Sequence, residues 1–166
     1  MKRALVTIAL AALSLSACQQ PKTEPATEKS AARAAAAPEA KPGIELSEGR
    51  LVLPAVAGNP GAAYFQINNS AGASTVIAGI SIDGSAKTEV HQTIGDTMTK
   101  VDQVEIAPST SIKFEPGALH VMVFELASTL KPGAKTELTV TFADGDKVSA
   151  PLKIEAAGGG MGGMEH

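Results

Sequence analysis

The chain has 166 residues, of which 19% are charged, and a formal net charge of −3 at pH 7. A mildly acidic chain without a cluster of lysine and arginine is a poor nucleic-acid binder, so we expect no nucleic-acid partner. The single cysteine, Cys18, excludes an internal disulfide. Stability must therefore come from an ordinary hydrophobic core.

Residues 1–17 have the pattern of a secretion signal. Lys2 and Arg3 precede an apolar run that is too short to span a bilayer. The run ends in Leu-Ser-Ala-Cys at residues 15–18, which resembles the lipobox of bacterial lipoproteins. We expect cleavage before Cys18 and attachment of lipid to it, which would anchor the protein to a membrane of the cell envelope, facing the periplasm. The alternative is an ordinary secretory leader that happens to contain a cysteine. If the protein is a lipoprotein, Gln19 after the cysteine favours sorting to the outer membrane, by resemblance to the enterobacterial sorting rule.

Residues 18–43 are predicted to form a disordered, lipid-anchored tether. From Gln19 to Gly43 the segment is rich in Ala, Pro, Glu, Lys and Thr and has no large apolar side chain. Such a segment cannot bury enough surface to offset the entropy lost on ordering.

Residues 44–155 are predicted to form one folded domain, whose size is common for a single domain. Short runs with β-type alternation are separated by Gly, Pro, Asn and Asp, and none of them sustains a helical period. The predicted strand runs are residues 49–56, 62–69, 74–83, 87–93, 100–108, 110–117, 119–126, 136–146 and 147–155. Asp144-Gly145 and Lys131-Pro132-Gly133 are turn signals. Eight or nine short strands predict an all-β fold, a single antiparallel β-sandwich or Greek-key barrel.

Residues 156–166 are predicted to form a flexible tail rich in glycine, methionine and histidine. Two interpretations of the tail stay open. Its Met161, Met164 and His166 could bind a metal ion, or they could be incidental residues of a glycine-rich terminus.

Histidine and methionine are rare after the leader and are not scattered. A methionine that served as a core filler should occur among the other strands as well. The seven residues are His91, Met98, His120, Met122, Met161, Met164 and His166. Four of them fall in two neighbouring regions of the domain, which predicts a common role.

The positions of these four residues predict a metal site. His120 and Met122 are two apart and share one face of a strand, so an imidazole and a thioether can converge. His91 lies toward the end of its run, and Met98 follows the Gly95-Asp96 turn. Two nitrogens and two thioether sulfurs suit Cu(I) far better than zinc, calcium or magnesium.

The residue types of the domain also exclude several functions. A blue-copper electron carrier needs a thiolate ligand and a Cys-x-x-x-Cys copper carrier needs two, whereas the domain contains no cysteine. No Gly-x-Ser-x-Gly motif or phosphate loop is present, so we do not expect an enzyme. A site that binds and releases copper indicates transport rather than catalysis. In the metal-binding interpretation of the tail, Met161, Met164 and His166 would form a second, weaker copper site that captures Cu(II) through the histidine.

Four segments of the domain, taken together, resemble the periplasmic copper chaperone family called PCu(A)C. They are residues 61–69, 88–92, 104–122 and 138–154, and they span essentially the whole domain in the family's order. Twenty-one residues separate Met98 from His120, as in the family's copper motif, which closes with His-x-Met. The six residues between His91 and Met98 make a shorter first gap than is usual in the family.

The resemblance implies a cupredoxin-like β-sandwich with a partly exposed Cu(I) site. Its implied ligands are His91, Met98, His120 and Met122. The implied acceptor is the binuclear copper centre of cytochrome c oxidase, with a thiol-based copper carrier as a further candidate partner. Two other functions stay open: copper storage or tolerance at the same site, and a metal-free scaffold in which His120 and Met122 are ordinary packing residues of a central strand.

Overall fold

The computed structural model describes residues 41–158, and within them the regular structure is β-strand. The strands are β1 (Ile44–Leu53), β2 (Gly61–Asn69), β3 (Thr75–Ile82), β4 (Ser85–Ile94), β5 (Thr97–Lys100), β6 (Val104–Ile106), β7 (Thr110–Phe114), β8 (Leu119–Leu126), β9 (Lys135–Phe142) and β10 (Lys147–Ala156). None of the described residues belongs to a helix long and apolar enough to cross a membrane. The predicted leader, Cys18 and the tail residues Met161, Met164 and His166 lie outside the described residues.

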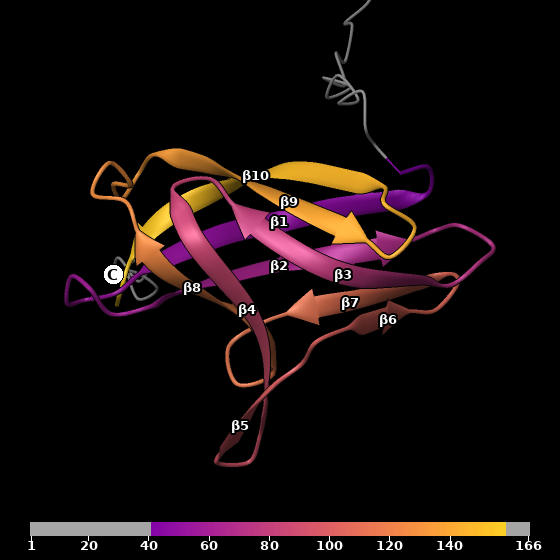
Figure 1. The fold of residues 1–166 in the computed structure, drawn as a ribbon, viewed down its shortest axis with the longest axis horizontal. Helices are drawn as coiled ribbons and strands as arrows, with labels where there is room; N and C mark the ends of the chain where they lie inside the picture. The colour runs from indigo at the N-terminus through magenta and orange to yellow at the C-terminus, as the bar shows by residue number, and fades with distance from the viewer. Residues whose placement is uncertain (1–40, 159–166) are drawn as a thin grey trace, which may run out of the picture. The chain divides into compact units, whose positions relative to one another are not determined.

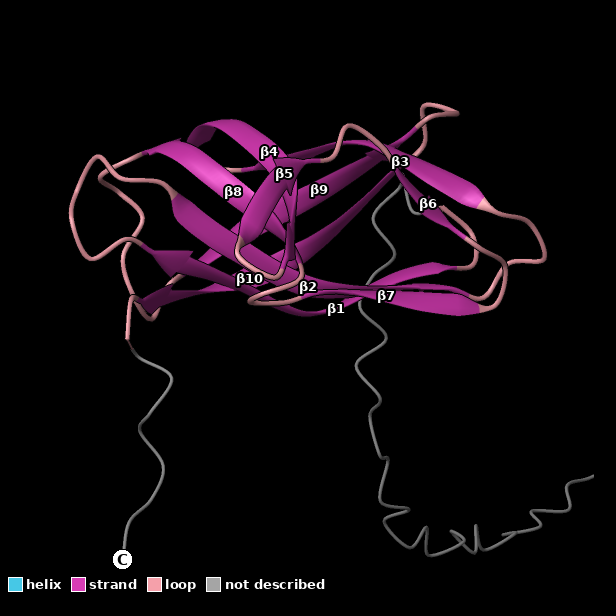
Figure 2. Ribbon diagram, turned by 90° about the horizontal axis from the view of Figure 1, so that it is seen from below, coloured by secondary structure: helices cyan, strands magenta, loops and turns pink. Residues whose placement is uncertain are grey.

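The strands form one sheet that folds back on itself around the core (Figures 1 and 2). Its order is β5-β4-β8-β2-β1-β10-β9-β3-β6, and β7 pairs with β2 beside this path. The all-β class predicted from sequence is confirmed. The expectation of a purely antiparallel sheet needs one correction, because β1 pairs with β10 in parallel. These strands are the first and last in the sequence, so no hairpin constrains their relative direction.

The segment between residues 85 and 106 differs most from the predicted strands. A tight hairpin joins β4 to β5 through Gly95-Asp96, with Ile94 opposite Thr97. Gly95 has a φ of 59° and is the first residue of a two-residue loop, a position where glycine is favoured. The predicted run 100–108 therefore divides: its first residue ends β5, and its middle forms the three residues of β6. Figure 1 shows β5 projecting from the rest of the sheet.

The core comes from strict alternation of inward and outward side chains. In β2, every second residue from Gly61 to Asn69 is buried. The ring of Phe65 stacks on that of Phe114 with 4.2 Å between centroids. The largest fully buried apolar side chains are Phe114, Phe142, Leu51, Ile67, Ile77, Ile106, Leu138, Leu152, Val121, Val123 and Val140. Because one face of β4 and of β8 packs against this core, the other face of these strands is available for polar side chains.

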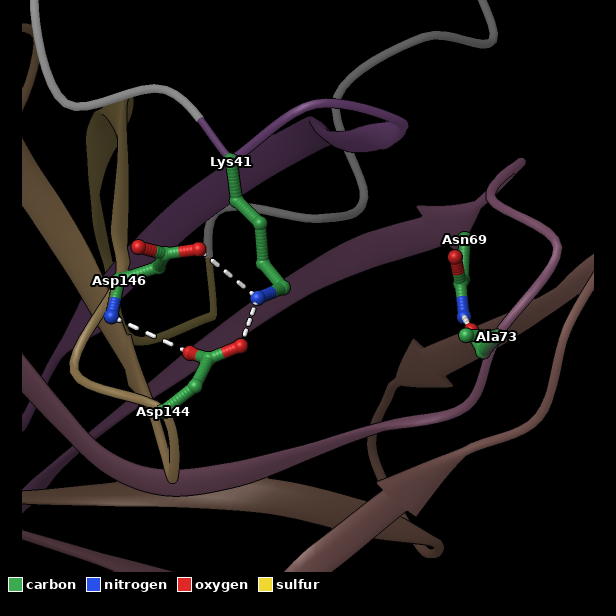
Figure 3. A network of polar contacts seen from close by, with 5 residues as sticks. All are labelled: Lys41, Asn69, Ala73, Asp144 and Asp146. Atoms are coloured by element: carbon green, nitrogen blue, oxygen red, sulfur yellow. Dashed lines mark hydrogen bonds and ion pairs between the residues drawn. The ribbon is translucent and has the colours of Figure 1, made fainter.

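Lys41 ties the residue stretch before β1 to the turn between β9 and β10 (Figure 3). Its ammonium group donates hydrogen bonds to the carboxylates of Asp144 and, at 2.9 Å, Asp146. The hydrogen bond between Lys41 and Asp144 raises the pKa of Lys41 and lowers the pKa of Asp144. Asp144 therefore stabilises the fold at pH values above the ordinary pKa of an aspartate. This stabilisation is lost as the pH falls through the lowered pKa of the folded protein.

Asn69 is the largest fully buried polar side chain of the described residues and joins three segments. Its amide nitrogen lies 2.9 Å from the carbonyl oxygen of Ala73 and 3.2 Å from that of Ile106, and its side-chain oxygen accepts from the backbone N–H of Ala71 at 3.0 Å. Figure 3 shows the bond to Ala73. Asn69 thereby holds β6 and the loop after β2 against the end of β2.

Replacement of Asn69 by alanine should lower the free energy of unfolding by about 1–3 kcal/mol, because it leaves buried carbonyl and N–H groups without partners. Denaturant unfolding followed by circular dichroism would measure the change. Asn68→Ala is the matched control, since the side chain of Asn68 accepts only one exposed hydrogen bond, from Ser111. Equal effects of the two substitutions would contradict this role of Asn69.

Candidate metal centre

The pairing of β4 with its two neighbours brings the predicted ligands of the domain to one face of the sheet. His91 on β4 lies directly opposite His120 on β8 and directly opposite Lys100 on β5. Residues directly opposite each other on paired strands point to the same face, as do residues two apart on one strand. Met122 and Met98 consequently share the face that carries both imidazoles.

His91, His120 and Met122 are immediate neighbours on this face. The two imidazole centroids are 6.1 Å apart with an interplanar angle of 41°. Met122 lies opposite Glu89, one step along the strand from the histidine pair, so it is diagonal to His91. Diagonal neighbours lie roughly 7–8 Å apart, within reach of a long side chain such as methionine.

The face that carries His120 and Met122 is not the face that builds the core. Val121 and Val123 are fully buried members of the core, whereas Met122 and Phe124 belong neither to the core nor to the side chains packed against it. His120 is nevertheless only 5% exposed. The alternation therefore points the imidazole and the thioether away from the apolar interior, which argues against ordinary core packing for these two residues.

Met98 lies on the same face but apart from the other three residues. It pairs with Thr93 at the end of the β4–β5 hairpin, so it is diagonal to His91 on the side away from His120. Its side chain is 52% exposed. The four residues thus form a close group of three, together with a fourth on a projecting hairpin.

Hydrogen bonds orient both imidazole rings. Nδ1 of His120 lies 2.9 Å from the carbonyl oxygen of Ala118, and Nε2 of His91 lies 3.2 Å from Oε2 of Glu89. Carbonyl and carboxylate oxygens only accept hydrogen bonds, so both ring nitrogens donate. Nε2 of His120 is the nitrogen left with a lone pair. In His91 the corresponding atom is Nδ1, which is buried and has no hydrogen-bond partner.

Glu89 is the acidic residue of this face, and the sequence analysis did not single it out. Its Oε1 atom lies 3.0 Å from Nζ of Lys87 and 3.8 Å from Nζ of Lys100. Hydrogen bonds from Lys87 and then from His91 lower the pKa of Glu89, so the group is a carboxylate at neutral pH. Its position two residues before His91 was the available signal, because period-two spacing alone places both on one face.

The donor set fits a soft or borderline metal ion and does not fit a hard one. Within residues 41–158, no three His, Cys, Asp or Glu side chains converge in a way that could hold a metal ion, so a site here requires thioether sulfur. Two imidazoles and one or two thioethers are ligands typical of Cu(I). The buried, unpartnered Nδ1 of His91 is the structural observation that a bound metal would account for. The predicted second site at Met161, Met164 and His166 lies outside the described residues and stays a prediction.

The chain matches one family model over most of its length and two relatives over a little more than half of it. The model of the family described as "Putative lipoprotein LpqE-like" matches residues 30–154. The uncharacterized protein RP573 of Rickettsia prowazekii is 31% identical over 98 residues, which cover 56% of this chain and 54% of RP573. A relative from Leifsonia xyli subsp. xyli is 24% identical over 99 residues, with 60% of its length covered. The chain thus matches less than two thirds of the length of these relatives.

Solved structures with the same fold are PCuAC domains. The copper-bound PCuAC domain from PmoF2 has a TM-score of 0.61 at 20% identity, and the match covers 70% of this chain and 96% of that domain. The solution structure of CuI-DR1885 from Deinococcus radiodurans has a TM-score of 0.54 at 20% identity, covering 79% of this chain and 85% of that one. The cupredoxin-like fold class and the PCu(A)C resemblance predicted from the sequence are confirmed.

Proposed function

The chain belongs to the LpqE-like lipoprotein family, and we propose that this member is a copper chaperone of the cell envelope. It binds Cu(I) through His91, His120, Met122 and Met98 and passes the ion to an acceptor. The observation that carries the proposal is the alignment of His91 with His120 across β4 and β8, with Met122 beside them on the same face. The buried and unpartnered Nδ1 of His91 gives this group a vacant donor atom.

The structural relatives support a copper cargo. The PCuAC domain from PmoF2 is described as copper-bound, and the DR1885 structure is described as CuI-DR1885. Both share the fold of this chain. At 20% sequence identity, these matches establish a shared fold and not a shared ligand. The extension to copper in this chain rests on the donor set described above, which lacks the convergent carboxylates that a hard cation would need.

The geometry suits exchange of the ion. All four proposed ligands are neutral, and Met98 is exposed on a projecting hairpin while His120 is buried against the sheet. An acceptor could displace Met98 first and then take over the remaining bonds one at a time through a shared-ligand intermediate. Few neutral ligands keep the complex exchangeable, so the direction of transfer follows the greater affinity of the acceptor.

The proposed location follows from the family and from the leader sequence. Membership of a lipoprotein family supports lipidation at Cys18, which would hold the protein at a membrane of the envelope. The residues between the lipid and Lys41 would act as the tether that lets the domain reach its partner. We propose the copper centre of cytochrome c oxidase as the final acceptor, with a thiol-based carrier as a further partner.

Cells that lack the protein would separate delivery from storage. Delivery predicts loss of cytochrome c oxidase activity in medium of low copper, with restoration by added copper. Storage or tolerance predicts normal oxidase activity at low copper and poor growth at high copper. The second result would overturn the delivery role while leaving the copper site intact.

Removal of either proposed ligand of β8, His120 or Met122, should greatly weaken Cu(I) binding. We expect His120→Ala and Met122→Ala each to weaken Cu(I) binding by more than about 100-fold, since even the outer partners of metal ligands are typically worth 10–100-fold. Competition with a chromogenic Cu(I) chelator measures the affinity. The chain should carry Cys18→Ser, which removes its only thiol.

Gln92→Ala is the matched control for these two variants, because Gln92 is exposed and adjacent to His91 but points to the other face of β4. Circular dichroism would verify that each variant folds. Folded His120→Ala protein with the affinity of the parent chain would refute the assignment of the site.

Met98 should contribute less to affinity than Met122 and more to the rate of release. We expect Met98→Ala to weaken Cu(I) binding by a smaller factor than Met122→Ala does and to accelerate transfer of Cu(I) to a competing chelator in stopped-flow measurements. Ile94→Ala removes another exposed apolar side chain from the same hairpin and should change neither quantity. Identical behaviour of the Met98 and Ile94 variants would exclude Met98 as a ligand.

A further inference from the structure

Glu89 connects His91 to two lysines on the face that carries the proposed copper site. One carboxylate oxygen lies 3.2 Å from Nε2 of His91, and the other lies 3.0 Å from Nζ of Lys87 and 3.8 Å from Nζ of Lys100. The Glu89 side chain is 19% exposed, whereas the two lysines are more than half exposed. The cations therefore hold the carboxylate from the solvent side, and its second oxygen is directed to the imidazole.

This contact determines which nitrogen of His91 carries the proton. A carboxylate only accepts, so Nε2 must donate, and the lone pair of the neutral ring then resides on Nδ1. His120 has the opposite arrangement, because its Nδ1 donates to the carbonyl oxygen of Ala118. Its lone pair resides on Nε2. The two histidines of the pair consequently present different ring nitrogens for binding.

We propose that Glu89 is a positioning residue for the proposed site: it fixes the orientation and tautomer of His91 so that Nδ1 binds Cu(I), while His120 binds through Nε2. The inference rests on the proposed function, since it concerns the same metal. It adds a residue outside the ligand set and assigns one donor atom to each histidine.

A purely structural role does not account for this arrangement. Ion pairs made by an exposed lysine, such as Lys87–Glu89, contribute little to stability. The orientation of His91 leaves Nδ1 buried without a partner, and a buried unsatisfied polar atom costs free energy. A ring oriented for stability alone would avoid that cost, whereas a ring held ready for a metal ion requires a free donor atom. Metal-binding histidines commonly donate their other N–H to a carboxylate or a carbonyl oxygen, and His91 and His120 show one case of each.

Nitrogen NMR of the imidazole rings tests the inference first in the metal-free protein. In the full chain with Cys18→Ser and 15N-labelled histidine, we expect His91 as the Nε2–H tautomer, with an Nε2 proton protected from exchange with water. Glu89→Ala should remove that protection, and Glu89→Gln should retain part of it, because the amide oxygen can still accept. Glu137→Ala, at an exposed glutamate of β9, is the control and should change nothing. Equal exchange in Glu89→Ala and parent protein would overturn the inference.

Cu(I), which is diamagnetic, then identifies the donor atoms directly. On loading, we expect the 15N signals of His91 Nδ1 and His120 Nε2 to shift, with the Nε2 proton of His91 retained. Glu89→Ala should lower Cu(I) affinity by about 10–100-fold, and Glu89→Gln by less. Loss of the Nε2 proton of His91 on loading, or an unchanged affinity of Glu89→Ala, would overturn the assignment while the proposed function stood. Failure of the parent chain to bind Cu(I) would refute the proposed function itself, and with it the metal role of Glu89.

Discussion

The register of β4 on β8 is the constraint on which the candidate site depends. It places His91 opposite His120 and, at the same time, Val90 opposite Val121. Because successive side chains of a strand alternate between faces, a slip of β4 by one residue would turn His91 toward the core and Val90 toward solvent. Burial of Val121 and Val123 and packing of Val90 against the core therefore fix the relative position of the two histidines. The apolar core and the candidate metal site thus lie on opposite faces of the same strand pair.

The site combines a firmly positioned part with an exposed part. His120 is almost fully buried and hydrogen-bonded to the backbone carbonyl of Ala118, just before β8, so its ring is held in place before any metal arrives. Met98, by contrast, lies on the short strand β5 at the edge of the sheet, where only β4 pairs with it. Ordered nitrogens retain an ion, and an exposed thioether at the edge offers a point where a partner can begin to displace it. This division suits the proposed function, in which the protein holds copper and also releases it.

Much of the fold and part of the site could be predicted from the sequence, because both depend on local patterns. Period-two alternation identified the strands, and the glycine turns marked their ends. The i, i+2 spacing placed His120 and Met122 on one face, as the structure also has them. The parallel pairing of β1 with β10 could not be predicted, since it joins segments at opposite ends of the domain that no local signal relates. The contact of Lys100 with Glu89 could not be predicted, because it depends on β5, a strand of which the predicted runs contained only the last residue although the Gly95-Asp96 turn before it was predicted.

X-ray absorption at the copper edge tests the central claim most directly. The measurement uses the chain with a single equivalent of Cu(I) and with alanine at Cys18, Met161, Met164 and His166, so that sulfur or imidazole ligands from the leader junction and the tail are removed. The account predicts a first shell of two imidazole nitrogens and one or two thioether sulfurs, retained against a Cu(I) chelator. A shell without sulfur, or loss of copper to a weak chelator, would contradict a copper site on this face of the sheet.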